Sequence, residues 1–154
     1  MKKNESQIIL ELDSFGSVNE DNLRDFEDLI TDAYENKGDK IIKSLLFSLS
    51  DQCEFDEVMF RVVHTLESFP LDKYLQELGD NITALFHKSP RWISILHTRI
   101  MNSPKIYETY LSEYSSLDIS ARNTLSNLLE LISKKEKFYD RCIYGIEYIK
   151  KMEI

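Results

Sequence analysis

Glycine and proline are scarce in this sequence, with four Gly and three Pro among 154 residues. Tight β-turns depend on these two residue types, so their scarcity argues against a β-sandwich or a β-barrel. Nucleotide-binding loops need several closely spaced glycines, which the chain does not offer. The sequence also has no run of roughly 18 apolar residues, so it predicts no membrane-spanning helix.

Cysteine is equally rare. Cys53 and Cys142 lie far apart, and neither belongs to a cysteine or histidine cluster. This spacing excludes the usual zinc and redox motifs and predicts two small, buried apolar side chains. The apolar run 7–10 is too short for the apolar core of a signal peptide. We therefore expect a cytoplasmic protein in a reducing compartment.

The composition is that of a folded domain. Hydrophobic residues make up 42% and charged residues 30% of the chain, which separates it from disordered sequences. A chain of this length buries roughly two-thirds of its unfolded surface without needing disulfides or metals. We expect one helical domain over residues 1–154.

Apolar residues recur at spacings of three and four along nearly the whole chain, as on one face of an amphipathic helix. The pattern predicts an all-α fold, an irregular or HEAT-like bundle of seven to eight antiparallel amphipathic helices. The stretch 7–12 fits a short helix or a strand, and we favour the helix. The helical segments are 17–36, 41–49, 55–66, 70–86, 90–100, 104–114, 118–132 and 138–151.

Several residues mark the ends of these segments. Ser103 before Pro104 is typical of an N-cap followed by the first helical residue, and Ser89 before Pro90 repeats the pattern. Gly38 is expected to take the left-handed conformation after the first of these segments. Gly79, inside a helical pattern, suggests the close approach of a neighbour.

Negative charge is concentrated near the N-terminus. The net charge is −8, and residues 1–60 hold 15 acids against 6 bases. A field of that sign repels nucleic acid and anionic lipid and favours a cationic partner. The carboxylates spaced to line one helix face are Asp21, Asp25, Asp28, Asp32 and Glu35. We expect this face to bind a partner, and a merely solvated face is the alternative.

No constellation predicts catalysis, a cofactor or a metal. His64 and Glu67 have the spacing used in di-iron bundles, but such sites need a second copy of the motif and further glutamates. The chain has no nucleophile turn of the Gly-x-Ser-x-Gly kind. An enzyme remains an alternative only if His64, Glu67 and Asp72 converge in one pocket.

Arg99 shares a helix face with Trp92. We expect Trp92 to have a structural role, in the core or in a groove. An unpaired guanidinium there would carry a large desolvation penalty. Arg99 should therefore either extend along the core to solvent or pair with a carboxylate, and Glu67 is our candidate partner.

Four stretches resemble a known family, namely His64-Thr65-Leu66-Glu67-Ser68-Phe69-Pro70, Tyr74-Leu75, Pro90-Arg91-Trp92 and Arg99-Ile100-Met101-Asn102-Ser103. Together they resemble the immunity protein 30 family of bacterial polymorphic-toxin systems. The resemblance covers about one third of the chain. It implies a mostly α-helical, non-enzymatic protein that forms a stoichiometric complex with the C-terminal domain of a cognate toxin.

The resemblance also implies a function for the acidic face. Many toxins of such systems are nucleases with cationic substrate clefts, which an acidic surface would complement. The alternative function is a helical adaptor or regulatory module that binds another cellular protein. The sequence does not distinguish a monomer from a dimer, because an apolar helix face serves a core or an interface equally well.

Overall fold

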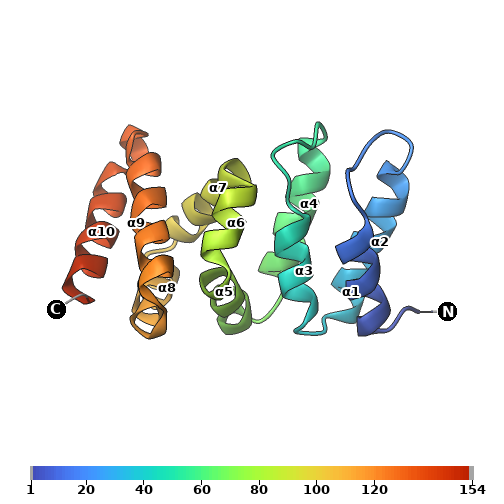
Figure 1. Ribbon diagram of the computed structural model, residues 1–154, viewed down its shortest axis with the longest axis horizontal. Coiled ribbons are helices and arrows are strands. Elements are labelled where there is room, and N and C mark those ends of the chain that lie inside the picture. Colours follow the sequence, from blue (N-terminus) through green and yellow to red (C-terminus); the bar gives the residue numbers. More distant parts are fainter. Residues whose placement is uncertain (1, 153–154) are drawn as a thin grey trace. The chain divides into compact units, whose positions relative to one another are not determined.

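The computed structural model describes residues 2–152 and is helical over 78% of the chain, with no strand in the described range (Figure 1). The all-α prediction is confirmed. The described residues form ten α-helices rather than the seven to eight expected: α1 (Glu5–Ser14), α2 (Leu23–Asn36), α3 (Ile41–Ser48), α4 (Asp56–Glu67), α5 (Leu71–Asp80), α6 (Ile82–Lys88), α7 (Pro90–Met101), α8 (Pro104–Glu113), α9 (Ile119–Ser133) and α10 (Tyr139–Met152).

Two differences account for the larger number. The stretch 7–12 lies inside a true helix, α1, and the segment 70–86 is divided into α5 and α6. The division falls at Asn81, whose backbone leaves helical geometry at φ −111° and ψ 11°. The apolar period runs through this residue without a gap, so periodicity alone does not reveal the break.

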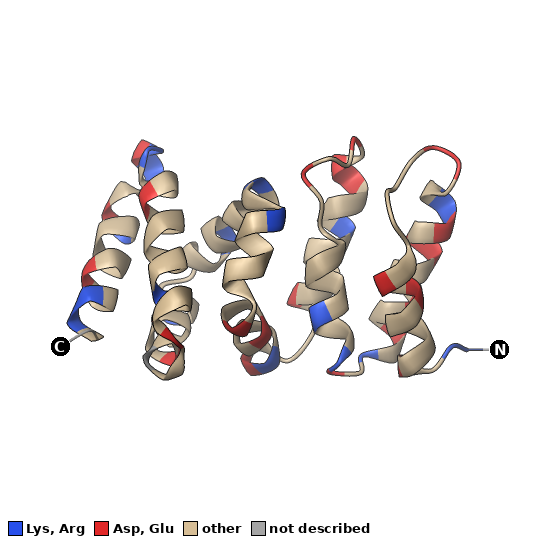
Figure 2. Cartoon of the chain, in the orientation of Figure 1, with Lys and Arg blue, Asp and Glu red and all other residues tan. Residues whose placement is uncertain are grey.

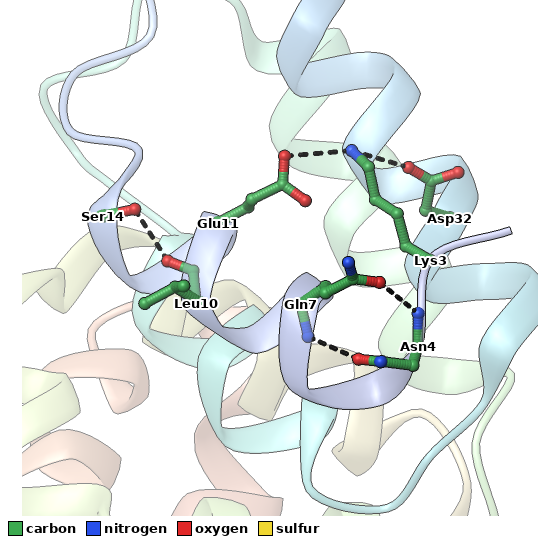
Figure 3. A network of polar contacts seen from close by, with 7 residues as sticks. All are labelled: Lys3, Asn4, Gln7, Leu10, Glu11, Ser14 and Asp32. Atoms are coloured by element: carbon green, nitrogen blue, oxygen red, sulfur yellow. Dashed lines mark hydrogen bonds and ion pairs between the residues drawn. The ribbon is translucent and has the colours of Figure 1, made fainter. Parts of the chain in front are cut away.

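A capping box starts α1 and explains why this stretch is a helix. The Asn4 side-chain oxygen accepts a hydrogen bond from the Gln7 backbone N–H at 2.9 Å (Figure 3). The Gln7 side chain in turn accepts one from the Asn4 N–H, also at 2.9 Å. Two N–H groups that the helix would leave without partners are thereby satisfied.

The helix α2 begins at Leu23, later than the expected start at residue 17 or 19. Gly16 adopts φ +78°, which ends the preceding segment. Asn19 then accepts hydrogen bonds from the N–H groups of Asp21 and Asn22, and Asn22 donates to the Ser17 carbonyl. Asparagine side chains stabilise such turns by competing with helical hydrogen bonds, so residues 17–22 form a loop.

At the other end of α2 the left-handed residue is Lys37, with φ +61°, and not Gly38. The ammonium group of Lys37 donates to the Ser68 hydroxyl at 2.6 Å and lies 3.8 Å from the centre of the Tyr34 ring. At Gly38 a Cβ would meet the Glu5 carboxylate, which is the end of a flexible side chain and would have to move.

The chain divides into two compact units, residues 1–78 and 79–154, which we describe separately. In the first unit, α1 packs against α2 and α3, and α4 packs against the same two helices. Its core is a set of fully buried apolar side chains: Ile8, Phe26, Ile30, Ala33, Ile41, Ile42, Leu45, Leu46, Leu49, Met59, Val62, Val63 and Leu66.

In the second unit, α9 packs along α10 and also contacts α6 and α7. Gly145 of α10 admits the Tyr107 side chain, whose hydroxyl donates to the Arg141 carbonyl at 2.8 Å. The close approach expected at Gly79 is confirmed, since a Cβ there would lie 3.1 Å from Leu117 Cδ1. The predictions of a single domain and of an antiparallel, HEAT-like or irregular arrangement stay predictions.

Candidate partner-binding surface

The division into units separates the charges of the chain. The first unit has 18 acids against 8 bases, and the second has 9 acids against 11 bases. Figure 2 shows acidic residues of the first unit on α1, on α2, near the start of α4 and on α5. The net negative charge of the protein therefore comes entirely from the first unit, because bases outnumber acids in the second.

Four of the five carboxylates expected on one face lie on α2, and Asp21 lies in the turn before it. At 3.6 residues per turn the four positions on α2 fall within about 80° of arc. Asp21, Asp25, Asp28 and Glu35 are exposed, and within residues 2–152 none of the four forms an ion pair. Together with Asp32 they are called the α2 acidic face below.

Asp32 differs from the other four because Lys3 binds it. The Lys3 ammonium lies 3.4 Å from the Asp32 carboxylate and 3.0 Å from that of Glu11 (Figure 3). The hydrogen bond to Glu11, and to a smaller extent Asp32, raises the pKa of Lys3. This exposed bridge joins α1 to α2 and neutralises one of the five carboxylates of the α2 acidic face.

A second acidic feature lies between α2 and α4, which pack against each other. An open hollow of about 720 Å³ is lined by four carboxylates, three apolar residues and one arginine. Its lining residues are Leu23, Glu27, Glu54, Phe55, Asp56, Glu57, Val58 and Arg61. Sequence analysis did not single out these carboxylates as a group. Glu54, Asp56 and Glu57 are neighbours in the sequence, but only the packing of α4 against α2 adds Glu27 to them.

Arg61 separates this hollow from a second one of about 490 Å³ along the same two helices. Its guanidinium pairs with the Glu27 carboxylate at 2.9 Å and donates to the Thr31 hydroxyl at 3.0 Å. The second hollow is lined by Ile30, Thr31, Tyr34, Glu35, Arg61, His64 and Thr65. The two hollows together are called the α2–α4 groove.

Of the three residues expected to be structural, Trp92 and Arg99 lie in α7 and Glu67 lies in α4. Trp92 is fully buried in α7, where the Arg91 guanidinium lies 5.0 Å from its ring. Arg99 is half-buried in the last turn of α7, and Glu67 is exposed at the end of α4. Arg99 and Glu67 belong to different units, so their pairing stays a prediction.

His97 is a buried polar residue that sequence analysis did not single out. Its Nδ1 atom lies 2.7 Å from the Ile93 carbonyl oxygen, and its Nε2 atom lies 2.6 Å from the Tyr110 hydroxyl. A carbonyl can only accept, so Nδ1 carries the proton and Nε2 accepts from Tyr110. The Tyr110 oxygen then accepts from the Tyr114 hydroxyl at 2.7 Å. Burial lowers the pKa of His97 to about 4.

The remaining candidate residues from the sequence are histidines, cysteines and the acids Glu67 and Asp72. His64 and His87 are exposed, and of the three residues that an enzyme would need, only His64 lines the α2–α4 groove. No group of three His, Cys, Asp or Glu side chains within residues 2–152 could hold a metal ion. Both cysteines are buried, as expected, although Cys53 lies in the loop after α3 and not on a helix. No described helix is long and apolar enough to cross a membrane.

The second unit has a smaller hollow of about 310 Å³ between α8 and α10. Tyr144 on its rim donates its hydroxyl proton to the Glu108 carboxylate, with oxygen distances of 2.6 and 2.8 Å. This hydrogen bond raises the pKa of Tyr144. The Glu108 carboxylate is therefore already engaged, whereas Asp25 and Asp28 of the first unit form no ion pair within residues 2–152.

The sequence matches a known protein family over more than half of its length. The immunity protein 30 family matches residues 18–110, which is more than half of the sequence. The chain belongs to the immunity protein 30 family. The matched segment contains all five residues of the α2 acidic face and the whole α2–α4 groove. No significantly similar protein was found among curated proteins or among solved structures.

Proposed function

We propose that this member of the immunity protein 30 family binds the C-terminal domain of a cognate bacterial toxin and neutralises it. The complex is stoichiometric, and the first unit covers the active site or the substrate approach of the toxin. The observation that carries the proposal is the exposure of four unpaired carboxylates on the α2 acidic face, within the segment that the family matches.

The charge of the first unit suits a cationic toxin such as a nuclease. A nuclease cleft is positive because it holds a phosphate backbone. Carboxylates displayed on a rigid helix attract such a cleft from a distance and increase the rate of association, an effect that salt weakens. Occlusion needs no catalytic group on the immunity protein, and it takes place in the cytoplasm of the cell that makes it.

Growth rescue tests the function directly. The toxin domain encoded by the neighbouring gene is expressed in a sensitive host with and without this protein. We expect growth only in the presence of the protein and a one-to-one complex in a pull-down. If the toxin arrests growth whether or not the protein is present and no complex forms, immunity to that toxin is wrong and the adaptor alternative gains support.

Charge reversal then tests the surface. Asp25→Lys with Asp28→Lys should slow association with the toxin about tenfold at low salt, while the Tm stays within about 2 °C. The matched control, Glu130→Lys with Glu136→Lys, makes the same change in net charge on exposed positions of the second unit. Equal slowing by both pairs would count against the α2 acidic face.

A further inference from the structure

The α2–α4 groove consists of two neighbouring hollows along the seam between α2 and α4. The residues that α2 contributes to it extend from Leu23 to Glu35, and Arg61 lines both of its hollows. Twelve residues of helix rise about 18 Å, a distance that an extended peptide covers with about five residues. The groove therefore has the length of a short chain segment rather than of a single side chain.

The charges of the groove favour a cation. Four carboxylates face one guanidinium in the first hollow. Two of them, Glu54 and Glu57, are exposed and form no ion pair within residues 2–152. The apolar residues Leu23, Phe55 and Val58 line the same hollow. Carboxylates together with apolar side chains suit the charged head and the long aliphatic stem of arginine or lysine.

Two cations of the chain itself contact residues that line the groove. The Arg61 guanidinium lies against Glu27, and the Lys37 ammonium lies on the Tyr34 ring, which lines the second hollow. Both contacts are of the kind that a partner cation would make. Arg61 is exposed, so its pair with Glu27 is easily exchanged in solvent.

We propose that the α2–α4 groove receives an extended segment of the toxin that carries two or more arginine or lysine residues. The first of these cations displaces Arg61 from Glu27, and a second binds beside Tyr34 and Glu35. This inference rests on the proposed function and adds a specific contact to it. The α2 acidic face attracts the toxin, whereas the groove holds it.

A synthetic peptide with three arginines in alternate positions tests the groove without the toxin. NMR titration of the labelled full-length protein should shift amide signals of α2 and α4 along the groove in a saturable manner. The same peptide with glutamine in place of arginine should shift none of them. Absence of shifts with the arginine peptide would overturn the proposal, and so would the same shifts on addition of calcium chloride.

Matched neutralisation separates the groove from the α2 acidic face. Glu54→Gln with Glu57→Gln and Asp25→Asn with Asp28→Asn each remove two exposed negative charges from the first unit. We expect the groove pair to weaken peptide binding at least about tenfold and the face pair to weaken it about twofold or less. Equal weakening would indicate general attraction to an acidic unit, and the groove proposal would be wrong.

Substitution of Arg61 distinguishes its displacement by a partner cation from a purely structural role. Arg61→Ala frees Glu27 and removes the competing cation, so affinity for the arginine peptide should rise about fivefold. Unchanged or weaker binding, with an intact circular dichroism spectrum, would contradict displacement. The outcome with the peptide does not depend on growth rescue. A groove that binds the peptide without rescue leaves the groove inference standing, and rescue without peptide binding removes only the groove.

Discussion

His97 Nε2 accepts the hydroxyl proton of Tyr110 at 2.6 Å in the core of the second unit, which fixes the imidazole in its neutral form. Protonation of His97 would force this nitrogen to donate toward a hydroxyl that already points at it. The pKa of His97 is about 4 in the folded protein, against an ordinary value of 6.5. The unfolded chain therefore takes up a proton at a higher pH than the folded chain does.

The stability of the protein should decrease as the pH falls, because the unfolded chain protonates His97 more readily than the folded chain does. The contribution is fully present above about pH 6.5 and is lost progressively as the pH decreases through 4, with a loss of about 2 kcal/mol between pH 7 and 4.5. Urea unfolding at several pH values measures this loss. His97→Gln removes the titrating group and should show a flatter dependence, and parallel curves for the two proteins would contradict the assignment.

Gly145 should be intolerant of a side chain. A Cβ there would lie 2.8 Å from Leu129 Cδ1 and would overlap the Tyr107 hydroxyl. Alanine favours a helix by about 1 kcal/mol over glycine, yet we expect Gly145→Ala to lower the free energy of unfolding by about 1–3 kcal/mol through overpacking. Chemical denaturation measures the change. In a Tyr107→Phe background the cost should be smaller, and strict additivity of the two substitutions would show that the hydroxyl is not the obstacle.

The helical class followed from the sequence because amphipathic periodicity survives in every long segment. The predicted cap at Ser103 is confirmed, since Ser103 accepts from the Ile106 N–H three residues away. Ser89 also takes the N-cap position, before Pro90, but its side chain makes no capping hydrogen bond to α7. The capping box of Asn4 and Gln7 carried the same kind of signal and could have settled the nature of residues 7–12.

Other features depend on tertiary contacts that no local pattern contains. His97 lies on an apolar face and is accommodated only because Tyr110, thirteen residues later, faces it. The groove exists because α4 packs against α2, which brings Arg61 to Glu27 from 34 residues away. The left-handed Lys37 is equally non-local, since its side chain reaches Ser68.

The two interactions at the start of α1 should differ in strength and in salt dependence. Asn4→Ala removes the capping box and should lower stability by about 1 kcal/mol at any ionic strength. Lys3→Ala removes the exposed bridge to Glu11 and Asp32 and should cost a few tenths of a kcal/mol, which high salt abolishes. Thermal unfolding in low and high salt distinguishes them. A larger, salt-resistant effect of Lys3→Ala would show that the bridge is more than a surface contact.

Cys142 should be inert in the folded protein. It is fully buried, and burial raises the pKa of its thiol to about 11. The thiolate is the reactive form, and at about pH 8 only about one thiol in a thousand would be ionised. Cys53→Ser leaves Cys142 as the single thiol, so alkylation by iodoacetamide followed by intact mass reports on this residue alone. We expect labelling at least about a hundredfold slower in native buffer than in denaturing urea. Comparable rates would mean that α10 separates from α9 within the native state, because only such an opening would expose the sulfur while the rest of the fold persists.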